Sequence, residues 1–254
     1  MTLAQMISLF RERQLLFGNN AVFRDGHSTD SSNSDSPVAS VSITSFINSA
    51  CRIINSRYGL NVQTTKVAGS VVNLINGVLS IDPSWVDVLY IEKGSDIDAS
   101  GATWQSSPYM VLSRASVSSI SGNGWNSPRM RIGNHNNLNE CTGYILIGNT
   151  KIRFIPAWTP LDASMYLYIT HVAAITPLAD VADTPSWIPS DFHEGIVFEA
   201  VRQSCIADAS NPNSSIRAES AMASYKEVMA PLEETMRERM STGTHLSRNG
   251  APDA

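Results

Sequence analysis

The fold is decided by a stretch near the C-terminus that reads Trp187-Ile188-Pro189-Ser190-Asp191-Phe192-His193-Glu194-Gly195-Ile196-Val197-Phe198-Glu199-Ala200-Val201 and, after a polar break, Ser220-Ala221-Met222-Ala223-Ser224-Tyr225-Lys226-Glu227-Val228-Met229. Pro189 and Ser190 are typical of a helix start, and the acidic residues that follow suit the positive end of a helix dipole. Helical spacing then places one apolar stripe on this helix: Phe192, Ile196, Val197, Ala200, Val201 and Cys205.

A second helix is predicted after the break Asn211-Pro212-Asn213-Ser214, because these residues end one helix and supply capping oxygens for the next. Its apolar stripe consists of Ala218, Ala221, Met222, Tyr225, Val228, Met229 and Leu232. Two apolar stripes joined by a short loop predict an αα-hairpin. Pro231 lacks an amide hydrogen, so we expect a kink or break near Ala230.

Two further helices are predicted near the N-terminus. Residues 2–17 can form a short one, and a longer one follows a cap at Ser42 or Thr44 and ends at Gly59. The intervening polar stretch 26–37 predicts a flexible linker.

The pattern changes to a period of two between these helices and the hairpin. Strands are predicted at 85–91, 143–147, 151–155 and 165–172, with a tight turn at Gly148-Asn149. The predicted fold class is therefore α+β: a small antiparallel helical bundle with an inserted antiparallel β-sandwich or barrel-like domain. The expected organisation is N-terminal helices (1–59), a β-rich domain (60–182), a C-terminal hairpin (183–240) and a flexible tail (241–254).

Composition limits the classes of protein to which this chain can belong. The net charge of −5 and a charged content of only 16% give no general case for nucleic-acid binding. We expect no secretory signal at Met1–Gly18, because positive charge is missing before the apolar residues and charged residues interrupt them, and no apolar run reaches the length of a membrane span. Cys51, Cys141 and Cys205 are far apart and odd in number, which favours reduced, buried thiols in a protein made in a cytosol.

Motifs for catalysis and metal binding are incomplete. His193-Glu194 opens like the zinc motif HExxH, but Val197 replaces the second ligand, which leaves a surface or capping histidine. Asp96 and Asp98 resemble an EF-hand start, but Ser107 stands where a bidentate glutamate is needed. The glycine-rich run 121–127 lacks the lysine of a P-loop. We therefore expect that the protein is not an enzyme and that it has no catalytic residue, metal site or cofactor.

One local charge asymmetry stands out in an acidic protein. Between Tyr109 and Ile155 the only acid is Glu140, and the basic residues are Arg114, Arg129, Arg131, Lys151 and Arg153. Such a run is either an ordinary solvated β face or a surface that faces DNA or a neighbouring subunit.

Several motifs resemble those of tailed-bacteriophage head-to-tail adaptor (connector or neck) proteins. They comprise the Pro-x-x-Phe-His opening at 189–193 with its two following helices, the Phe-Ile-Asn-Ser-Ala helix at 46–50, Asp82-Pro83, Ser113-Arg114, Phe154-Ile155-Pro156 and Pro177-Leu178. In order, they cover the chain from about Ser42 to Arg239.

The resemblance implies a structural virion protein of the neck, between capsid portal and tail. Such adaptors form a closed ring of about twelve copies beneath the portal. They extend the DNA channel, through which genomic DNA passes without sequence-specific binding, and they provide the docking surface for tail-tube or nozzle proteins. The expected partners are other copies, the portal protein and tail proteins, with no membrane; the tail at 242–254 would dock on the portal.

The alternative is a β-sandwich module of the virion that binds glycans or receptors. Its stacking platforms would be the exposed rings of Trp104, Trp125 and Trp158. An enzyme would instead need a pocket with converging histidine and acidic groups.

Overall fold

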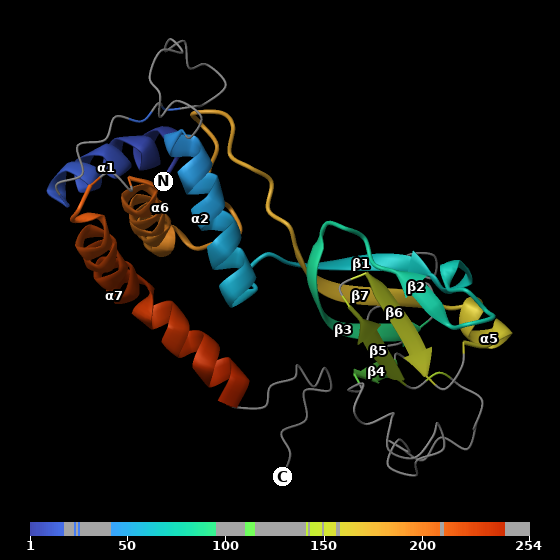
Figure 1. Cartoon of the computed structure of the whole chain (residues 1–254). Coiled ribbons are helices and arrows are strands. Elements are labelled where there is room, and N and C mark those ends of the chain that lie inside the picture. The colour runs from blue at the N-terminus through green and yellow to red at the C-terminus, as the bar shows by residue number, and fades with distance from the viewer. Residues whose placement is uncertain are drawn as a thin grey trace. The chain divides into compact units, whose positions relative to one another are not determined.

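The structure is a computed structural model that describes residues 1–17, 23, 25, 42–94, 110–114, 141, 143–148, 150–155, 158–208 and 211–241, apart from the side chains of Met110, Ser113 and 238–241. The chain forms two compact units (Figure 1). The helical unit comprises Met1–Leu60 and Ile175–Ala254, and the β unit comprises Asn61–Ala174. The α+β class predicted from the sequence is confirmed.

The helical unit contains α1 (Leu3–Leu16), α2 (Ile43–Tyr58), the 3-10 turn η4 (Ser190–Phe192), α6 (His193–Ala207) and α7 (Ser214–Ser241). Capping sets the ends of the first two helices. Thr2 and Gln5 form a capping box on α1, Ser42 caps α2, and Gly59 ends α2 with a φ of 58°. The α-helix of the hairpin begins at His193, later than the predicted start at Pro189 and Ser190, because Pro189 caps a 3-10 turn that Ser190–Phe192 form first.

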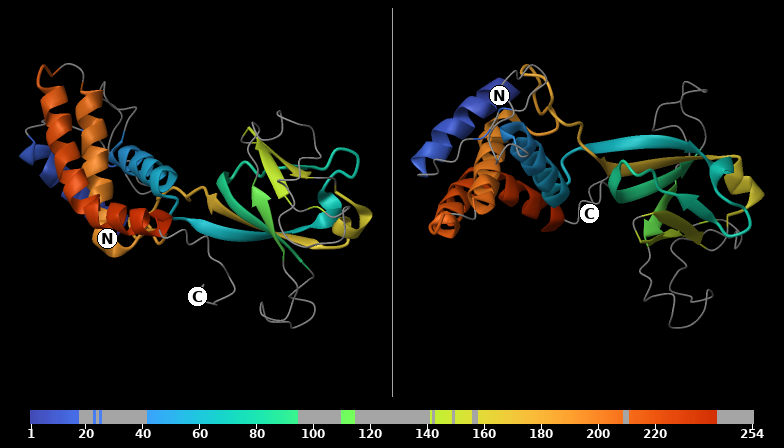
Figure 2. Two further views of the ribbon diagram at one scale, coloured as in Figure 1. Left: turned by 90° about the horizontal axis from the view of Figure 1, so that it is seen from below. Right: turned by 45° about the horizontal axis from the view of Figure 1, so that its top comes forward.

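One apolar core fills the helical unit. The predicted stripes face it, and fully buried members come from all four helices: Leu3, Phe10, Ile47, Ile54, Ile196, Val201, Ala221 and Met229. Helix α7 runs through Pro231 without a break, so of the predicted kink or break only a kink remains. Figure 2 shows α7 bending part-way along its length, as a proline within a helix causes.

The stretch that returns from the β unit belongs to the helical unit from Ile175 onward, earlier than the predicted boundary at 182. The side chain of Asn48 in α2 holds it through two bonds to the backbone of Leu178, 2.9 and 2.8 Å long. The carbonyl of Val181 accepts a bond from the amide of Ala4 at the start of α1. These contacts explain why residues 175–182 do not stay with the sheet.

The β unit is one seven-stranded sheet in the order β1-β7-β3-β4-β5-β6-β2. Its elements are β1 (Val62–Ala68), η1 (Gly69–Val71), β2 (Val78–Ser80), β3 (Trp85–Gly94), β4 (Met110–Arg114), β5 (Gly143–Ile147), β6 (Lys151–Ile155), α5 (Pro160–Ala163) and β7 (Tyr166–Ala173). The sheet curves around a single apolar core (Figures 1 and 2).

All strand pairs in the described part of this sheet are antiparallel except β4 with β5, which are parallel. The prediction of a purely antiparallel sheet therefore needs this one correction. The four predicted strands correspond to β3, β5, β6 and β7, with β5 and β6 joined at Gly148, whose φ is 59°. Strands β1, β2 and β4 were not predicted as strands.

Candidate functional site

Two of the predicted basic residues lie together on β6. Lys151 and Arg153 alternate with Ile152 and Phe154, which are 0% and 1% exposed and belong to the core. Both basic residues therefore point to the outer face of the sheet. They pair across to Ser80 and Val78 of the edge strand β2.

Arg114 does not join them. It lies at the end of β4 on the same face as Leu112, which is 2% exposed and faces the core. Its guanidinium donates a bond of 3.4 Å to the carbonyl of Val88. Arg129 and Arg131 lie outside the described residues. The structure thus brings together Lys151 and Arg153, while Arg114 is on the opposite face of the sheet.

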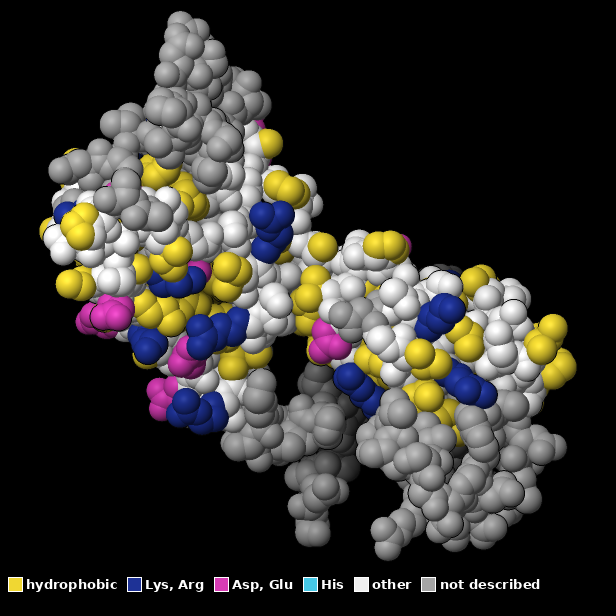
Figure 3. All heavy atoms as spheres, viewed as in Figure 1, with side chains coloured by type: hydrophobic (Ala, Val, Ile, Leu, Met, Phe, Trp, Pro, Cys, Tyr) yellow, Lys and Arg dark blue, Asp and Glu magenta, His cyan; other side chains and the backbone are white. Residues whose placement is uncertain are grey.

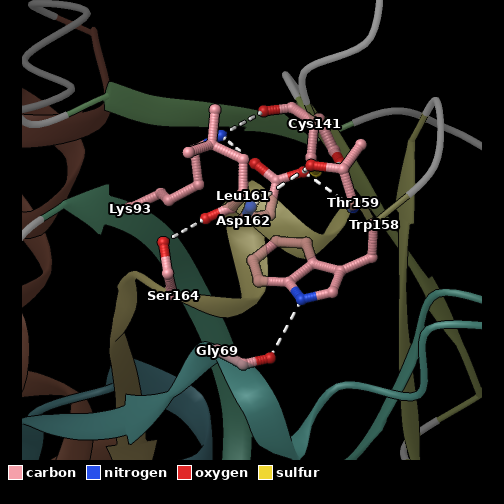
Figure 4. Close-up of polar contacts among 9 residues, drawn as sticks. Gly69, Lys93, Cys141, Trp158, Thr159, Leu161, Asp162 and Ser164 are labelled. Atoms are coloured by element: carbon pink, nitrogen blue, oxygen red, sulfur yellow. Dashed lines mark hydrogen bonds and ion pairs between the residues drawn. The ribbon is translucent and has the colours of Figure 1, made fainter.

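Lys93 and Asp162 form the centre of a buried polar cluster in the β unit (Figure 4). Their side chains are only 4% and 1% exposed, and the Lys93 ammonium donates to Asp162 Oδ1 and, over 3.2 Å, to the carbonyl of Cys141. Asp162 Oδ2 accepts from the amide of Thr159 at 2.9 Å and from its hydroxyl at 2.7 Å. All oxygens of this buried carboxylate therefore have partners.

This cluster joins parts of the chain that are distant in sequence. Lys93 is the penultimate residue of β3, Cys141 precedes β5, and Asp162 belongs to α5. Burial, and secondarily the charge of Asp162, raises the pKa of the Cys141 thiol to about 12, so it stays protonated and a poor nucleophile at neutral pH. A satisfied ion pair beside an inert thiol fits a structural anchor rather than a reaction centre.

Trp158 extends the anchor toward η1. Its indole Nε1 donates to the carbonyl of Gly69 over 2.9 Å, and its ring packs against Phe154 with 4.6 Å between centroids. The ring is 3% exposed, so the expectation that Trp158 forms an exposed stacking platform is wrong. Trp104 and Trp125 lie outside the described residues.

His193 is also buried, at 2% exposure, so of the surface or capping role expected for it the surface role is wrong. Its Nδ1 lies 2.6 Å from the amino group of Met1, and its Nε2 lies 3.2 Å from the carbonyl of Ile188. Burial is the main cause that lowers its pKa, which favours a neutral ring. It tethers the start of α6 to Met1 and Ile188.

A polar network joins α2 to the part of α7 that follows Pro231. The Tyr58 hydroxyl donates to Glu233 at 2.7 Å and accepts from the Tyr225 hydroxyl at 3.3 Å. Arg57 lies 3.8 Å from the same carboxylate. Burial and these bonds raise the pKa of Tyr58, so its hydroxyl remains a donor that holds α7 beyond its proline.

Sequence reasoning missed an exposed apolar surface at one end of the β unit. It consists of Val71, Leu74, Ile75 and Leu161, which are 63%, 53%, 98% and 54% exposed. These four residues are called the apolar tip below. Figure 3 shows hydrophobic side chains at the right-hand edge, over η1 and α5. The run from Val67 to Ile81, which contains no charged residue, could have indicated this surface. It did not, because apolar residues in a sequence usually indicate a buried core.

Within the described part of the chain, no group of three or more His, Cys, Asp or Glu could hold a metal ion, and no helix is long and apolar enough to cross a bilayer. The chain matches no protein-family model and no curated protein. The case for a function therefore depends on the motifs and on the geometry of the two units.

Proposed function

We propose that this chain is the head-to-tail adaptor of a tailed bacteriophage, a structural virion protein that forms a ring beneath the portal. In this role it extends the DNA channel and offers a docking surface to tail proteins. Its work is mechanical, so it requires rigid units and exposed contact surfaces rather than a reaction centre.

The main support is the discontinuous helical unit. Helix α2 leads into the β unit, and the chain then returns to build α6 and α7 against the first two helices. Two adaptor-like motifs contact each other at this return: Asn48, from the motif in α2, binds both backbone groups of Leu178, from the motif after β7. Asn48 and Leu178 thus share one structural role. Two motifs that matched by coincidence would have no reason to contact each other, so this contact supports the proposal.

Lys151 and Arg153 give the proposal its candidate contact surface. They lie on the outer face of an edge region of the sheet, where a neighbouring subunit, a tail protein or DNA in the channel could reach them. Phosphate contacts would make such a surface sensitive to salt. With Arg114 on the other face of the sheet, Lys151 and Arg153 are the first described residues to change.

The decisive experiment locates the chain in purified virions. Mass spectrometry against the portal protein gives the copy number, and gold-labelled antibody with electron microscopy gives the position. We expect about a dozen copies at one vertex, between head and tail. Label on fibres or capsid faces would instead favour a receptor-binding module, and absence from virions would contradict the proposal.

A genetic test addresses the contact surface separately. Lys151→Glu with Arg153→Glu should lower the yield of tailed particles, whereas the control Arg52→Glu, at an exposed position of α2 in the helical unit, should not. Normal yield from the double variant would exclude these two residues from the assembly contacts while leaving the neck position to the microscopy.

A further inference from the structure

The apolar tip is a preformed projection. In the turn between η1 and β2, the amide of Ile75 donates to the Asn73 side chain at 2.9 Å, and the amide of Gly77 donates to the Asn73 carbonyl at 2.7 Å. The amide of Val78 donates to the side chain of Asn76 at 3.1 Å. The turn therefore meets its own hydrogen-bonding needs and can present Leu74 and Ile75 to an apolar surface.

The buried anchor fixes the base of this tip. A Cβ atom added to Gly69 would lie 2.4 Å from the carbonyl oxygen of Asp162 and 2.6 Å from that of Met165, so η1 and α5 are in close contact. The Lys93–Asp162 pair and the Trp158 indole hold the same two elements. A rigid apolar projection loses little conformational entropy on binding, which favours a contact role.

Among the described residues, the solvent-accessible charges next to the tip are basic. No charged residue occurs from Val67 to Ile81, and Lys66, Lys151 and Arg153 follow at its base, on β1 and on the strand that pairs with β2. The nearest acid along the chain, Asp82, lies beyond the far end of β2. The acid Asp162 is buried and paired. A partner should therefore combine exposed apolar side chains with acidic neighbours.

The helical unit of this same chain has those properties. Its described side chains include twelve acidic and eight basic ones, a balance of −4, whereas those of the β unit include four acidic and five basic ones, a balance of +1. Around the turn between α6 and α7, Ile206 and Ile216 are 54% and 62% exposed. The acids there are the half-buried Asp208 and the exposed Glu219, against one half-buried base, Arg217. We call Ile206, Ile216 and Glu219 the acidic hairpin end.

We propose that the apolar tip of one copy docks on the acidic hairpin end of a second copy. The two surfaces differ, so the contact is head-to-tail and leaves each pair with one free tip and one free hairpin end. Closing the assembly into a ring satisfies both. The inference rests on the proposed ring and names the surfaces that build it.

The first test measures assembly of the purified full-length chain by native mass spectrometry and analytical ultracentrifugation across concentration. The wild type should form closed oligomers, and Ile75→Asp should lower the association constant at least tenfold. Ile75 is 98% exposed, so this variant should keep its fold, checked by circular dichroism. The matched control Val62→Asp, at the other end of β1 and 50% exposed, should assemble normally.

Mixing two defective variants gives the sharper result. Ile75→Asp lacks a working tip and Ile216→Asp lacks a working hairpin end, so each should be monomeric alone. A head-to-tail contact predicts that the mixture forms one-to-one pairs and no larger rings. A wild type that stays monomeric, oligomers indifferent to Ile75→Asp, or a mixture that stays monomeric would each overturn the inference.

The two proposals can fail separately. Tip-dependent oligomers of a chain that is absent from virions would leave this contact standing and remove the adaptor role. A chain found at the neck whose oligomers ignore both variants would keep the adaptor role and remove this contact.

Discussion

The two units each bury a carboxylate, but they pair it in different surroundings. In the helical unit Glu199 is 4% exposed at its side chain, and its partner Arg202, which donates two bonds of 2.6 and 2.8 Å, is 28% exposed. In the β unit both Lys93 and Asp162 are withdrawn from water. Water can replace a lost partner in the first case and not in the second. The β unit therefore depends more strongly on a single pair.

The largest expected effect comes from breaking that pair. Asp162→Ala leaves an unpaired buried ammonium and should destabilise the β unit by about 3–5 kcal/mol. Glu199→Ala, the matched change in the helical unit, should cost about 1–2 kcal/mol because Arg202 retains access to water. Guanidinium unfolding followed by hydrogen exchange, which separates the two units, measures both. Equal losses would show that burial of the partner does not govern the cost.

A pair of glycines compares the packing of the units. Gly69→Ala places Cβ against two backbone carbonyls, and neither can move freely, so we expect a loss of about 1–3 kcal/mol. Gly195→Ala meets the Met229 side chain at 2.6 Å, and a methionine can change rotamer, so its loss should be smaller. The comparison fails if Gly195→Ala is the more damaging of the two in thermal unfolding.

Removing a helix cap should also destabilise the β unit more than the helical unit, but by a smaller margin. Ser42 caps α2 with one exposed bond of 3.1 Å to the Ser45 amide, and Ser42→Ala should cost about 1 kcal/mol. Thr159 caps α5 and also donates to the buried Asp162, so Thr159→Ala should cost about 2 kcal/mol. Chemical denaturation of both variants tests the order, and a costlier Ser42→Ala would reverse it.

The least perturbing probe is alkylation of the cysteines. Burial raises the pKa of Cys51 in the helical unit and of Cys141 in the β unit to about 12, from 9.0. Because the folded-state pKa is the higher one, the stability contributed by each neutral thiol is complete below about pH 9 and is lost as the pH rises toward 12. Native protein at pH 8 should resist iodoacetamide until denaturant is added.

Asp162 distinguishes the two thiols, because its charge helps to raise the pKa of Cys141 but not that of Cys51. An Asp162→Asn variant should therefore make Cys141 reactive at a lower pH and leave Cys51 unchanged. Mass spectrometry of the alkylated peptides reads both sites at once, and a parallel shift of the two cysteines would contradict this cause.

The helical unit was the more predictable from sequence because its signals are local. Ser42 and Gly59 bound α2 within one helical turn of their partners, and the stripes of α6 and α7 follow a spacing that any short window reveals. The 3-10 turn before His193 was missed because Pro189 and Ser190 suit either helix type. Beyond Pro231, helix α7 is bonded to a residue distant in sequence, because Tyr58 donates to Glu233.

The β unit was less predictable because its order comes from contacts between distant residues. Strand β1 reads Val-Gln-Thr-Thr-Lys-Val-Ala and lacks an apolar alternation, since it lies at the sheet edge. The parallel pairing of β4 with β5 leaves no trace in either segment. Of the predicted basic site, the alternation on β6 places Lys151 and Arg153 together, but the face on which Arg114 lies depends on the register of β4 with β3.

The side chain of Asn61 joins the first and the last residues of the inserted β unit, and this has a mechanical consequence. Asn61 donates from its side chain to the carbonyls of Ala173 and Ala174, 3.2 Å each, and its own carbonyl accepts from the amide of Ala173 at 2.8 Å. Beyond it, Val62 pairs with Val172. Tension between the entering strand β1 and the leaving strand β7 would act on these bonds one after another, beginning at Asn61. The hydrogen bonds of Asn61 are therefore the first to break under force. Their combined strength sets the force at which β1 separates from β7.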